Sequence, residues 1–433
     1  RTDNKAFSAT YRSMHWDGEL VARQINPADG SVIETPLWQA RALLNAKVAA
    51  AGDSRRIFKT ASDSALLQNF TWDTMTTAQQ AYFRNKCDLL SQCVTFNADT
   101  KAIANSGENM VNYLRGQTGH SGELTQITKA YRLRANTLGD LVGSTAAYVN
   151  IPRFSYVDNV SPNYQSFKIA KANRHGMVYV GGNDGMLHGF NAQTGVESWA
   201  YVPHSVMPNM HKLADKNYAT THQFFVDGSP ISMDVYDTTT NAWRTIVVGG
   251  LNAGGRGYYA LDVTDEDSPK ALWEFCHSNA YCRSWDADLG YTYGNPIVTK
   301  MPAGSAHAGR WVVIFTSGYN NVSPGNGQGY LYIVDAISGT LLQKVTTGVG
   351  SSATPSGFAK LAGNLGPNGN SEVDATLIAV YGGDLQGNVW KANLQTSTTT
   401  ISRMASLLDP VGVGQPITTR PVHGKIPNMQ DFV

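Results

Sequence analysis

Short apolar segments alternate with glycine-rich turns through the last two thirds of the chain. Each apolar segment ends in one or two glycines, and after a turn a second segment follows that is rich in aromatic residues. Such continuous apolar runs are typical of β-strands whose two faces are both covered. The pattern occurs four times, and its first segment closes in turn at Gly182, Gly250, Gly318 and Gly383.

These four copies recur at a nearly constant spacing. From 182 to 250, from 250 to 318 and from 318 to 383, the distances are 68, 68 and 65 residues. A fixed period is the signature of a repeat fold, and repetition around a central channel protects the strand edges. The pattern therefore predicts an all-β protein, a β-propeller of seven irregular blades with quinoprotein-like repeats. The period exceeds the roughly 40–50 residues of common propeller repeats, so long loops are expected.

The first third of the chain is less regular. Residues 18–25 alternate between apolar and polar positions like a strand, and Asp29 and Gly30 predict a turn after it. Residues 56–58 are expected to form the partner strand. Between them, residues 38–44 predict a short helix with Trp38 on its apolar face.

Residues 74–116 carry a helical pattern. Thr77 and Gln80 have the spacing of a capping box, and Gly116 is a natural helix end. We expect this segment to be a helical insertion that crosses one face of the propeller.

Strand patterns reappear at residues 138–142 and again at 416–422. The second is not followed by a full repeat, so the last blade is expected to be incomplete. The chain starts at Arg1. We interpret residues 1–433 as a single propeller domain that is a fragment of a larger protein.

Charge and composition narrow the class of protein. Charged residues make up 15% of the chain, against about 25% in average globular proteins. The formal net charge is +1, so no overall field favours nucleic acid or anionic lipid. No apolar run approaches the roughly 18 residues of a transmembrane helix.

The four cysteines form two pairs, each with five intervening residues. They are Cys87 with Cys93 and Cys276 with Cys282. A zinc site would require a shorter C-x₂-C spacing or matching histidines, and neither occurs. Two local disulfides in an oxidising compartment are the favoured interpretation, and four buried free thiols are the alternative.

Several long motifs together resemble one known family. They are residues 178–190, 225–230, 249–264 and 381–390. In this order they are similar to the C-terminal propeller of the PilC/PilY family of type IV pilus tip-associated proteins. The resemblance implies export through the periplasm to the cell surface and the pilus tip. It also implies a role in pilus extension and retraction, with the pilus tip complex and a host-cell receptor as partners and a part in adhesion and virulence.

Catalysis is the competing hypothesis. The repeats are similar to those of quinoprotein dehydrogenases, but no two cysteines are adjacent as in those enzymes. His188 and His222 have no acid or nucleophile close by in sequence, so structural roles are favoured. The Gly-rich residues 252–257 lie between two strands, which indicates a hairpin in preference to a phosphate cradle. A non-enzymatic protein is therefore expected, and a periplasmic scaffold for outer-membrane assembly is a further alternative.

One loop is a candidate calcium site. Asn368, Asn370, Glu372 and Asp374 place oxygen-bearing side chains at alternate positions, as short Ca²⁺ loops do. The resemblance implies a calcium loop at this place before the strand that contains Tyr381. Two carboxylates alone imply weak affinity, and a solvated Asn/Gly turn is the alternative interpretation.

The family resemblance points to one adhesive motif to look for. Some members carry an Arg-Gly-Asp tripeptide that binds integrins, and the nearest match here is Arg115-Gly116-Gln117, which lacks the acid. The adhesive surface is therefore not assigned.

Overall fold

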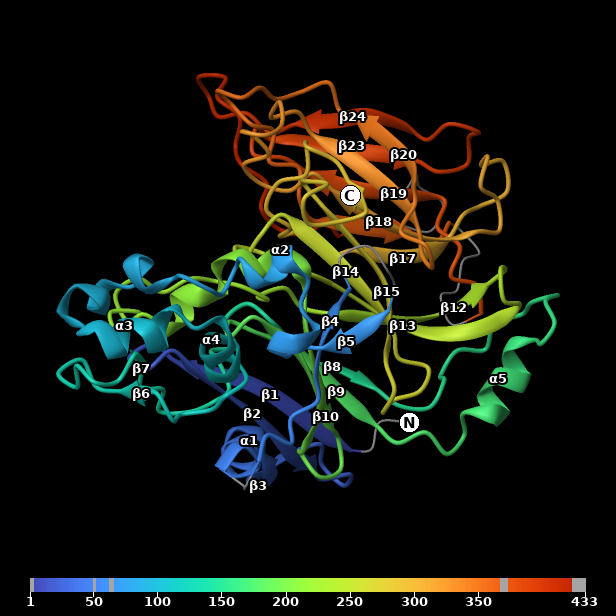
Figure 1. Cartoon of the computed structure of the whole chain (residues 1–433). Helices are drawn as coiled ribbons and strands as arrows, with labels where there is room; N and C mark the ends of the chain where they lie inside the picture. Colours follow the sequence, from blue (N-terminus) through green and yellow to red (C-terminus); the bar gives the residue numbers. More distant parts are fainter. Residues whose placement is uncertain (1–3, 50–51, 62–65, 367–372, 423–433) are drawn as a thin grey trace. The chain divides into compact units, whose positions relative to one another are not determined.

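The computed structural model describes residues 4–49, 52–61, 66–366 and 373–422 (Figure 1). The chain forms two compact units. Unit 1 comprises Arg1–Asn150 and His175–Pro230, and unit 2 comprises Ile151–Arg174 and Ile231–Val433. The single-domain organisation expected from the repeats stays a prediction.

Unit 1 contains a six-stranded sheet. Its strands are β4 (Ile57–Thr60), β5 (Leu67–Asn69), β8 (Ala147–Val149), β9 (Met177–Gly182), β10 (Met186–Asn191) and β11 (Glu197–Val202). The order across the sheet is β5-β4-β11-β10-β9-β8. The first repeat copy supplies the antiparallel pair β9 and β10, and both strands are almost entirely buried, as their continuous apolar pattern predicts.

Unit 2 contains one sheet for each of the other three repeat copies. The first sheet has β12 (Ile231–Asp237), β13 (Ala242–Gly250), β14 (Gly257–Asp262), β15 (Lys270–Cys276) and β16 (Ser284–Trp285). The second has β17 (Ile297–Lys300), β18 (Trp311–Thr316), β19 (Tyr330–Asp335) and β20 (Leu341–Thr346). The third has β21 (Leu361–Asn364), β22 (Ala379–Gly383), β23 (Asn388–Asn393) and β24 (Thr400–Ser406).

In each sheet of unit 2, strands that follow one another in the chain are neighbours. Each repeat copy forms two adjacent antiparallel strands: β13 with β14, β18 with β19, and β22 with β23. This meander is the architecture of a propeller blade. The described residues therefore form four blade sheets, and the predicted number of seven is not confirmed.

Aromatic side chains fill the core between the first two sheets of unit 2. Tyr164 lies on α5 (Tyr164–Ala170), and its ring packs edge-on against Trp243 with 4.8 Å between centroids. Trp243 in turn lies 6.1 Å from Trp311 of the next sheet. Edge-to-face pairs of this kind add stabilisation beyond the area that they bury.

A tryptophan docks on the turn of a following sheet in each unit. The indole of Trp273 donates a hydrogen bond to the carbonyl of Ala336 at 3.0 Å, and its ring lies against Gly339. Gly339 has φ of +67°, and a Cβ there would fall 2.4 Å from the indole. In unit 1, Trp38 repeats the contact by donating to Ala192 at 3.1 Å. A glycine is thus required at the turn both for the backbone angle and for the ring.

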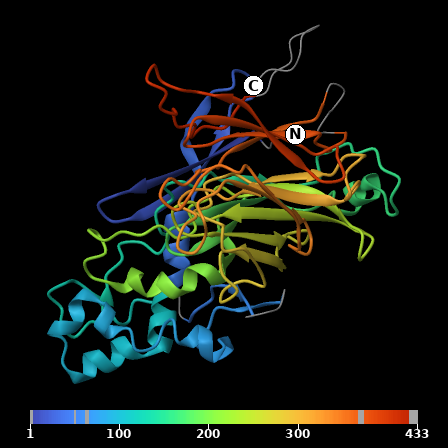
Figure 2. The ribbon, with the colours of Figure 1, turned by 90° about the horizontal axis from the view of Figure 1, so that it is seen from above.

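The helical insertion is confirmed. Residues 72–114 form η1 (Trp72–Thr74), α2 (Thr77–Gln80), η2 (Cys87–Leu89), η3 (Ser91–Thr95), α3 (Ala98–Asn105) and α4 (Gly107–Leu114). Figures 1 and 2 show this segment, light blue to cyan, as a cluster of short helices at the edge of unit 1. A further 3₁₀ helix, η4 (His204–Ala214), packs against α4.

Both cysteine pairs are disulfides, as the spacing predicts. Cys87 is bonded to Cys93 within the helical insertion, and Cys276 to Cys282 directly after β15. No described cysteine is free, so the alternative of four thiols does not hold.

The predicted capping box is wrong by one residue. The side chain of Thr76, not Thr77, accepts from the backbone of Gln79, and Gln79 reaches back to the backbone of Thr76. Both registers satisfy the sequence pattern. Burial decides between them, because Gln79 is completely buried and its amide donates to the carbonyl of Thr60 at 3.2 Å.

The start of unit 1 also departs from the prediction. Residues 17–25 do form a strand, β2 (Asp17–Ile25), but its partners are β1 (Lys5–Arg12) and β3 (Val32–Gln39). Of the expected partner at residues 56–58, Ile57 and Phe58 lie in β4, which pairs in parallel with β11. The helix α1 begins at Ala40 and ends at Ala49. Trp38 precedes it in extended backbone, because docking on Ala192 holds its side chain.

Two other predicted strands are absent. Residues 138–142 form a single bridge at Gly139, and the strand follows later as β8. Residues 416–422 form no strand. The remaining pair, β6 (Ser121–Gly122) and β7 (Tyr131–Arg132), is very short. No helix within the described ranges is both long and apolar enough to cross a membrane.

Candidate functional site

The richest cluster of polar side chains lies inside unit 1. Arg55 precedes β4, and its guanidinium binds both carboxylate oxygens of Glu197 on β11, at 2.7 and 2.8 Å. Both side chains are buried. Burial alone would raise the pKa of Glu197, but Arg55 and His188 outweigh it and hold that pKa far below its usual range. The pair is therefore ionised, and it joins β11 to the distant segment that precedes β4.

His188 on β10 extends this pair into a network. Its Nδ1 lies 2.8 Å from Glu197 and its Nε2 lies 3.0 Å from Asp184. Burial disfavours the imidazolium, but the two carboxylates more than compensate and raise the pKa of His188 to about 9. His188 is fully buried, and both ring nitrogens are engaged, so it has the structural role that we predicted. Its acidic partners are, however, four residues upstream and nine residues downstream in sequence, contrary to the expectation that none was near.

Two of the family-like motifs, residues 178–190 and 225–230, meet the segment 139–143 beside this histidine. The backbone amide of Gly139 donates to Asp184 at 2.9 Å, and Asn183 donates to Asp140 at 2.7 Å. The amide of Gly143 donates to Asp227 at 2.8 Å. A Cβ at Gly139 would fall 2.4 Å from the backbone of Asp184. The segments around 140, 184 and 227 can therefore approach only because a glycine stands at this position.

His222, whose side chain is largely buried, joins the same region. Its Nε2 contacts both oxygens of Asp140, at 3.0 and 3.1 Å, and its ring stacks on Trp16 with 3.6 Å between centroids. The predicted structural role of this histidine is supported by both contacts. Asp140 was not recognised as its partner, because 82 residues separate them.

The helical insertion is anchored to the network through Arg115, which directly follows α4. Its guanidinium pairs with Asp53 and donates to the carbonyls of Phe70 and Arg55 at 2.9 and 2.8 Å. Arg55 in turn donates to the carbonyl of Arg115 at 2.7 Å. The first residue of the Arg115-Gly116-Gln117 tripeptide is thus buried and fully engaged, and it is not presented to a receptor.

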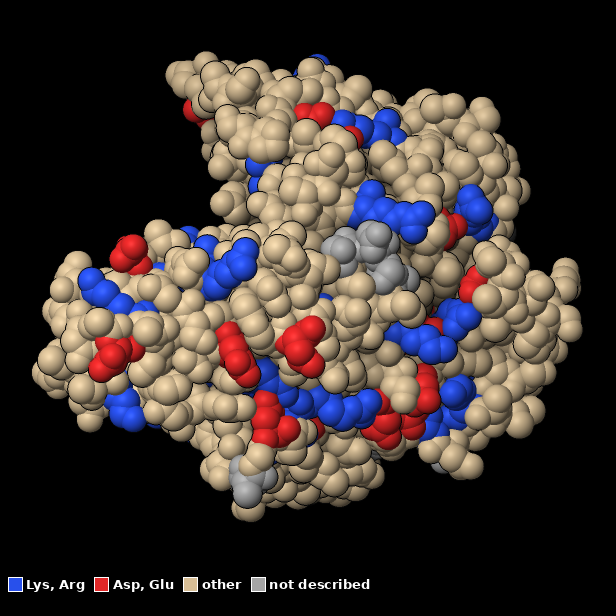
Figure 3. All heavy atoms as spheres, in the orientation of Figure 1, with Lys and Arg blue, Asp and Glu red and all other residues tan. Residues whose placement is uncertain are grey.

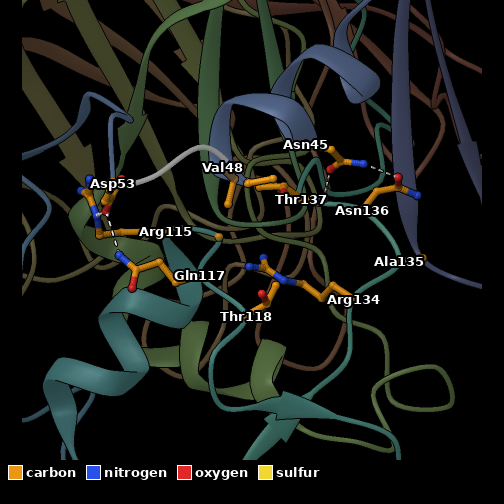
Figure 4. A pocket seen from close by; sticks show the side chains of 13 residues that line it. Asn45, Val48, Asp53, Arg115, Gln117, Thr118, Arg134, Ala135, Asn136 and Thr137 are labelled. Atoms are coloured by element: carbon orange, nitrogen blue, oxygen red, sulfur yellow. Dashed lines mark hydrogen bonds and ion pairs between the residues drawn. The ribbon is translucent and has the colours of Figure 1, made fainter.

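A cavity of about 470 Å³ opens beside this anchor (Figure 4). Its walls come from the second half of α1, from the turn at Asp53, from the end of α4 and from the segment before Leu138. The lining residues are Asn45, Val48, Ala49, Gly52, Asp53, Arg115, Gly116, Gln117, Thr118, Arg134, Ala135, Asn136 and Thr137. All belong to unit 1. Sequence reasoning identified only Arg115, Gly116 and Gln117 among them.

The other sequence candidates lie in unit 2. Of the proposed calcium ligands, Asn368, Asn370 and Glu372 lie outside the described residues. Asp374 is 53% exposed and forms an ion pair with Lys300 at 2.9 Å. Among the described residues, no three histidine, cysteine, aspartate or glutamate side chains gather as a metal site would require.

The Gly-rich residues 252–257 connect β13 to β14, as expected for a hairpin. The side chain of Arg256 donates to three backbone carbonyls, those of Leu289, Val322 and Pro324. It therefore braces loops of unit 2 and is not left to hold a phosphate.

Charge on the surface is mixed. Figure 3 shows lysine and arginine interspersed with aspartate and glutamate on the face that it draws, among mostly uncharged residues. That face carries no extended area of one sign, in keeping with the net charge of +1.

The four blade sheets define this chain as a β-propeller protein. The profile of the family described as PilY1 beta-propeller domain matches residues 138–411. The chain therefore belongs to the PilY1 β-propeller family, as the motifs indicated.

Relatives and a solved structure support the assignment. The type IV pilus biogenesis factor PilY1 of Pseudomonas aeruginosa strain UCBPP-PA14 is 35% identical over 414 residues, which cover 92% of this chain and 32% of the relative. The PilY1 of strain PAK is 33% identical over 90% of this chain and 31% of its own length. A PilY1 homolog of Xylella fastidiosa is 29% identical over 96% of this chain and 29% of its own length. This chain thus spans about a third of these relatives.

The crystal structure of the Pseudomonas aeruginosa PilY1 C-terminal domain is similar as well. Its TM-score is 0.50 at 29% sequence identity, and the match covers 64% of this chain and 56% of that domain.

Proposed function

We propose that this chain is a non-enzymatic part of the type IV pilus biogenesis machinery and that it acts by binding other proteins. The observation that carries the proposal is family membership: relatives that match at least 90% of the chain are named type IV pilus biogenesis factors. The remaining two thirds of those relatives lie outside this match, so the proposed task of the chain is that of the propeller alone.

The arrangement of the buried ionic network supports a binding role over catalysis. A general base needs a free ring nitrogen within reach of a substrate, whereas both nitrogens of His188 contact carboxylates inside the core. The network joins the helical insertion to the sheet of unit 1, which is a structural task.

A complementation experiment tests the pilus role. The gene for the protein would first be deleted from a bacterium that normally carries type IV pili. The deletion strain would then receive either the wild-type gene or a gene that lacks the region encoding this chain. We expect surface pili, counted by electron microscopy, to return only with the wild-type gene. Immunoblotting must show equal amounts of the two proteins. Normal piliation by the deleted form would contradict the proposal.

The enzyme alternative has its own test. Purified protein should retain no pyrroloquinoline quinone after dialysis, and it should not reduce an artificial dye with alcohols or sugars. Quinone absorbance that survives dialysis, together with dye reduction, would establish a dehydrogenase instead.

We further propose that the chain is displayed at the cell surface, at the pilus tip, and contributes to host-cell adhesion. Beads coated with the purified chain should bind cultured epithelial cells more than beads coated with heat-denatured chain. Labelling of intact bacteria with a membrane-impermeant reagent separates this location from that of a periplasmic scaffold, which would remain unlabelled.

Calcium binding at residues 368–374 is a third proposal. Amide and carboxylate oxygens are the ligands that Ca²⁺ prefers. The Asp374 carboxylate already contacts Lys300 and Thr376, so a cation must displace the ammonium, and we expect a Kd of about 10⁻⁴–10⁻³ M. Calorimetry with CaCl₂ should show binding that Asp374→Ala abolishes. Identical melting temperatures of both proteins with and without millimolar calcium would contradict calcium binding at this segment.

A further inference from the structure

Arg134 lines the cavity together with Arg115, and it differs from Arg115 and from Arg55 of the neighbouring ionic network. Arg55 and Arg115 each have a carboxylate partner, Glu197 and Asp53. The guanidinium of Arg134 donates to the carbonyl of Tyr113 at 2.6 Å and lies over the Tyr113 ring, 4.5 Å from its centroid. Within the described part of the chain, no carboxylate lies within ion-pair distance of Arg134. Its charge is therefore not neutralised by a described side chain.

The Arg134 side chain lies in the wall of the cavity. Figure 4 shows it extending inward from residues 134–137, toward the side from which Thr118 projects. Arg134 as a whole residue is half-buried. Burial lowers the pKa of Arg134, which means that this cation is less well solvated than a surface arginine. A partly desolvated guanidinium with unused N–H groups is a strong receptor for an anion.

The other polar groups of the cavity are largely satisfied by one another. Asp53 is paired with Arg115 and also accepts from Gln117 at 3.3 Å. The amide of Asn45 donates to Asn136 at 2.7 Å. The net charge that the lining presents is thus a single positive charge, from Arg134.

These features select the chemistry of the ligand. A planar carboxylate matches the fork of a guanidinium, and one negative charge balances one cation. A phosphate dianion would carry a second negative charge that Arg134 alone does not balance. An acidic sugar needs many free donors and acceptors, whereas the amides of Asn45 and Asn136 are already paired. The volume of about 470 Å³ exceeds a carboxylate alone and lies within the range of ligand pockets.

The rest of the lining suits a peptide. Val48, Ala49 and Ala135 offer apolar contacts, and Thr118 lies beside the Arg134 side chain (Figure 4). We propose that this cavity binds an acidic peptide segment, whose carboxylate pairs with Arg134 and whose neighbouring residues contact α1 and the end of α4. The proposal does not depend on a role in pilus biogenesis, and it names a site that can be measured on the purified chain.

The direct test compares two end-blocked peptides, acetyl-Ala-Glu-Ala-Ala-amide and the same peptide with Gln in place of Glu. Binding is measured by ligand-observed NMR titration. We expect the Glu peptide to bind about 10-fold or more tightly than the Gln peptide, because a charge-assisted pair to Arg134 is lost in the latter. Equal affinities, or no binding of the Glu peptide, would overturn the proposal.

Further probes identify the source of the carboxylate. Tri-alanine with a free C-terminus is compared with its amide. Where the Glu peptide binds, additional binding of the free acid would show that a chain end is accepted as well, and no binding of the free acid would assign an acidic side chain. Saturable binding of inorganic phosphate or glucuronate, without binding of either acidic peptide, would overturn the assignment to a peptide.

Variants tie the effect to the cavity. Arg134→Gln should lower the affinity for the Glu peptide about 10-fold or more and should change the affinity for the Gln peptide little. Arg84→Gln is the matched control, because this substitution removes the same charge from an exposed arginine that does not line the cavity. Unchanged affinity in Arg134→Gln would contradict the site.

Arg134 also contacts Tyr113, so Arg134→Gln could impair folding. Two further variants then decide. Arg134→Lys keeps the charge without the fork and should retain partial affinity. Ala135→Phe fills the cavity from an exposed position and should lower the affinity for the Glu peptide. Its melting temperature should stay within a few degrees of that of the wild type. Wild-type affinity in Ala135→Phe would place the peptide elsewhere.

Discussion

The sheet of unit 1 and the sheets of unit 2 arise from copies of one repeat, yet their interiors are held together differently. Between the first two sheets of unit 2, the core is aromatic and contains Tyr164, Trp243 and Trp311. In unit 1, the sheet carries the ion pair of Arg55 with Glu197. The aromatic core has no ionised member among these rings, whereas the network in unit 1 depends on the charge of each group.

The difference shows which part of a repeat is general and which is local. The strand pairs and the docked tryptophan occur in both units, with Trp38 in unit 1 and Trp273 in unit 2. The ionic network occurs where the helical insertion joins the sheet, because Arg55 and Arg115 bind each other's carbonyls there. Apolar packing thus builds the blade, and the charges specify where the insertion attaches.

The largest expected effect comes from removing one charge of the network. Arg55→Met leaves Glu197 buried without its partner and should lower the free energy of unfolding by about 3–5 kcal/mol. Arg56→Met, at the exposed neighbouring position, should change it by less than about 0.5 kcal/mol. Denaturation with urea, followed by circular dichroism, measures both. Equal stability of the two variants would show that the network contributes nothing to unit 1.

The second prediction separates the two units by pH. The pKa of His188 is raised to about 9 in the folded protein, above the roughly 6.5 of an unfolded histidine. Its stabilising contribution is therefore complete below pH 6.5 and is lost as pH rises through 9. Asp184 and Glu197 have lowered pKa values, so their contributions are lost only in acid.

We expect the free energy of unfolding of the wild-type protein to fall by on the order of 2 kcal/mol between pH 6.5 and pH 9. His188→Asn should be less stable at pH 6.5 and should show a smaller change with pH. His120→Asn is the control, because no carboxylate holds that histidine in the described structure, and it should follow the wild type. A wild-type pH slope in His188→Asn would contradict the assignment.

The third prediction compares the two disulfides. Replacing Cys87 and Cys93 by serine should destabilise the helical insertion of unit 1 by about 2–3 kcal/mol, because the short loop no longer restricts the unfolded chain. The same change at Cys276 and Cys282 should act on unit 2. Hydrogen exchange read by mass spectrometry locates each effect. If the variant without Cys276 and Cys282 showed faster exchange in the helical insertion and no change after β15, the prediction would be wrong.

The smallest expected effect lies within the insertion itself. Thr76→Ala removes the cap of α2 and should cost about 1 kcal/mol. Thr77→Ala, one residue later at an exposed position, should be almost neutral. Thermal melts of the two variants decide the register. If Thr77→Ala is the more destabilising of the pair, the capping box is the one expected from the sequence pattern.

The repeats show how far local information reaches. The paired glycines and the constant spacing predict β9 with β10 and the corresponding pairs of unit 2, because a hairpin is closed by residues that are near in sequence. The same holds for the disulfide of Cys87 with Cys93 and for the helices of residues 72–114. In each case the signal and the partner lie within one short segment.

Other features depended on the tertiary structure, because their partners are distant in sequence. The pairing of β4 with β11, the ion pair of Arg55 with Glu197, and the contact of His222 with Asp140 each join segments more than 80 residues apart. Local patterns carry no record of such neighbours. Burial also selected Thr76 over Thr77 as the cap, since both fit the pattern. The sequence by itself thus determined the strand pairs of the repeats, their turns and the family of this chain. Long-range packing decided the strand partners at the start of unit 1, the ionic network and the cavity beside Arg134.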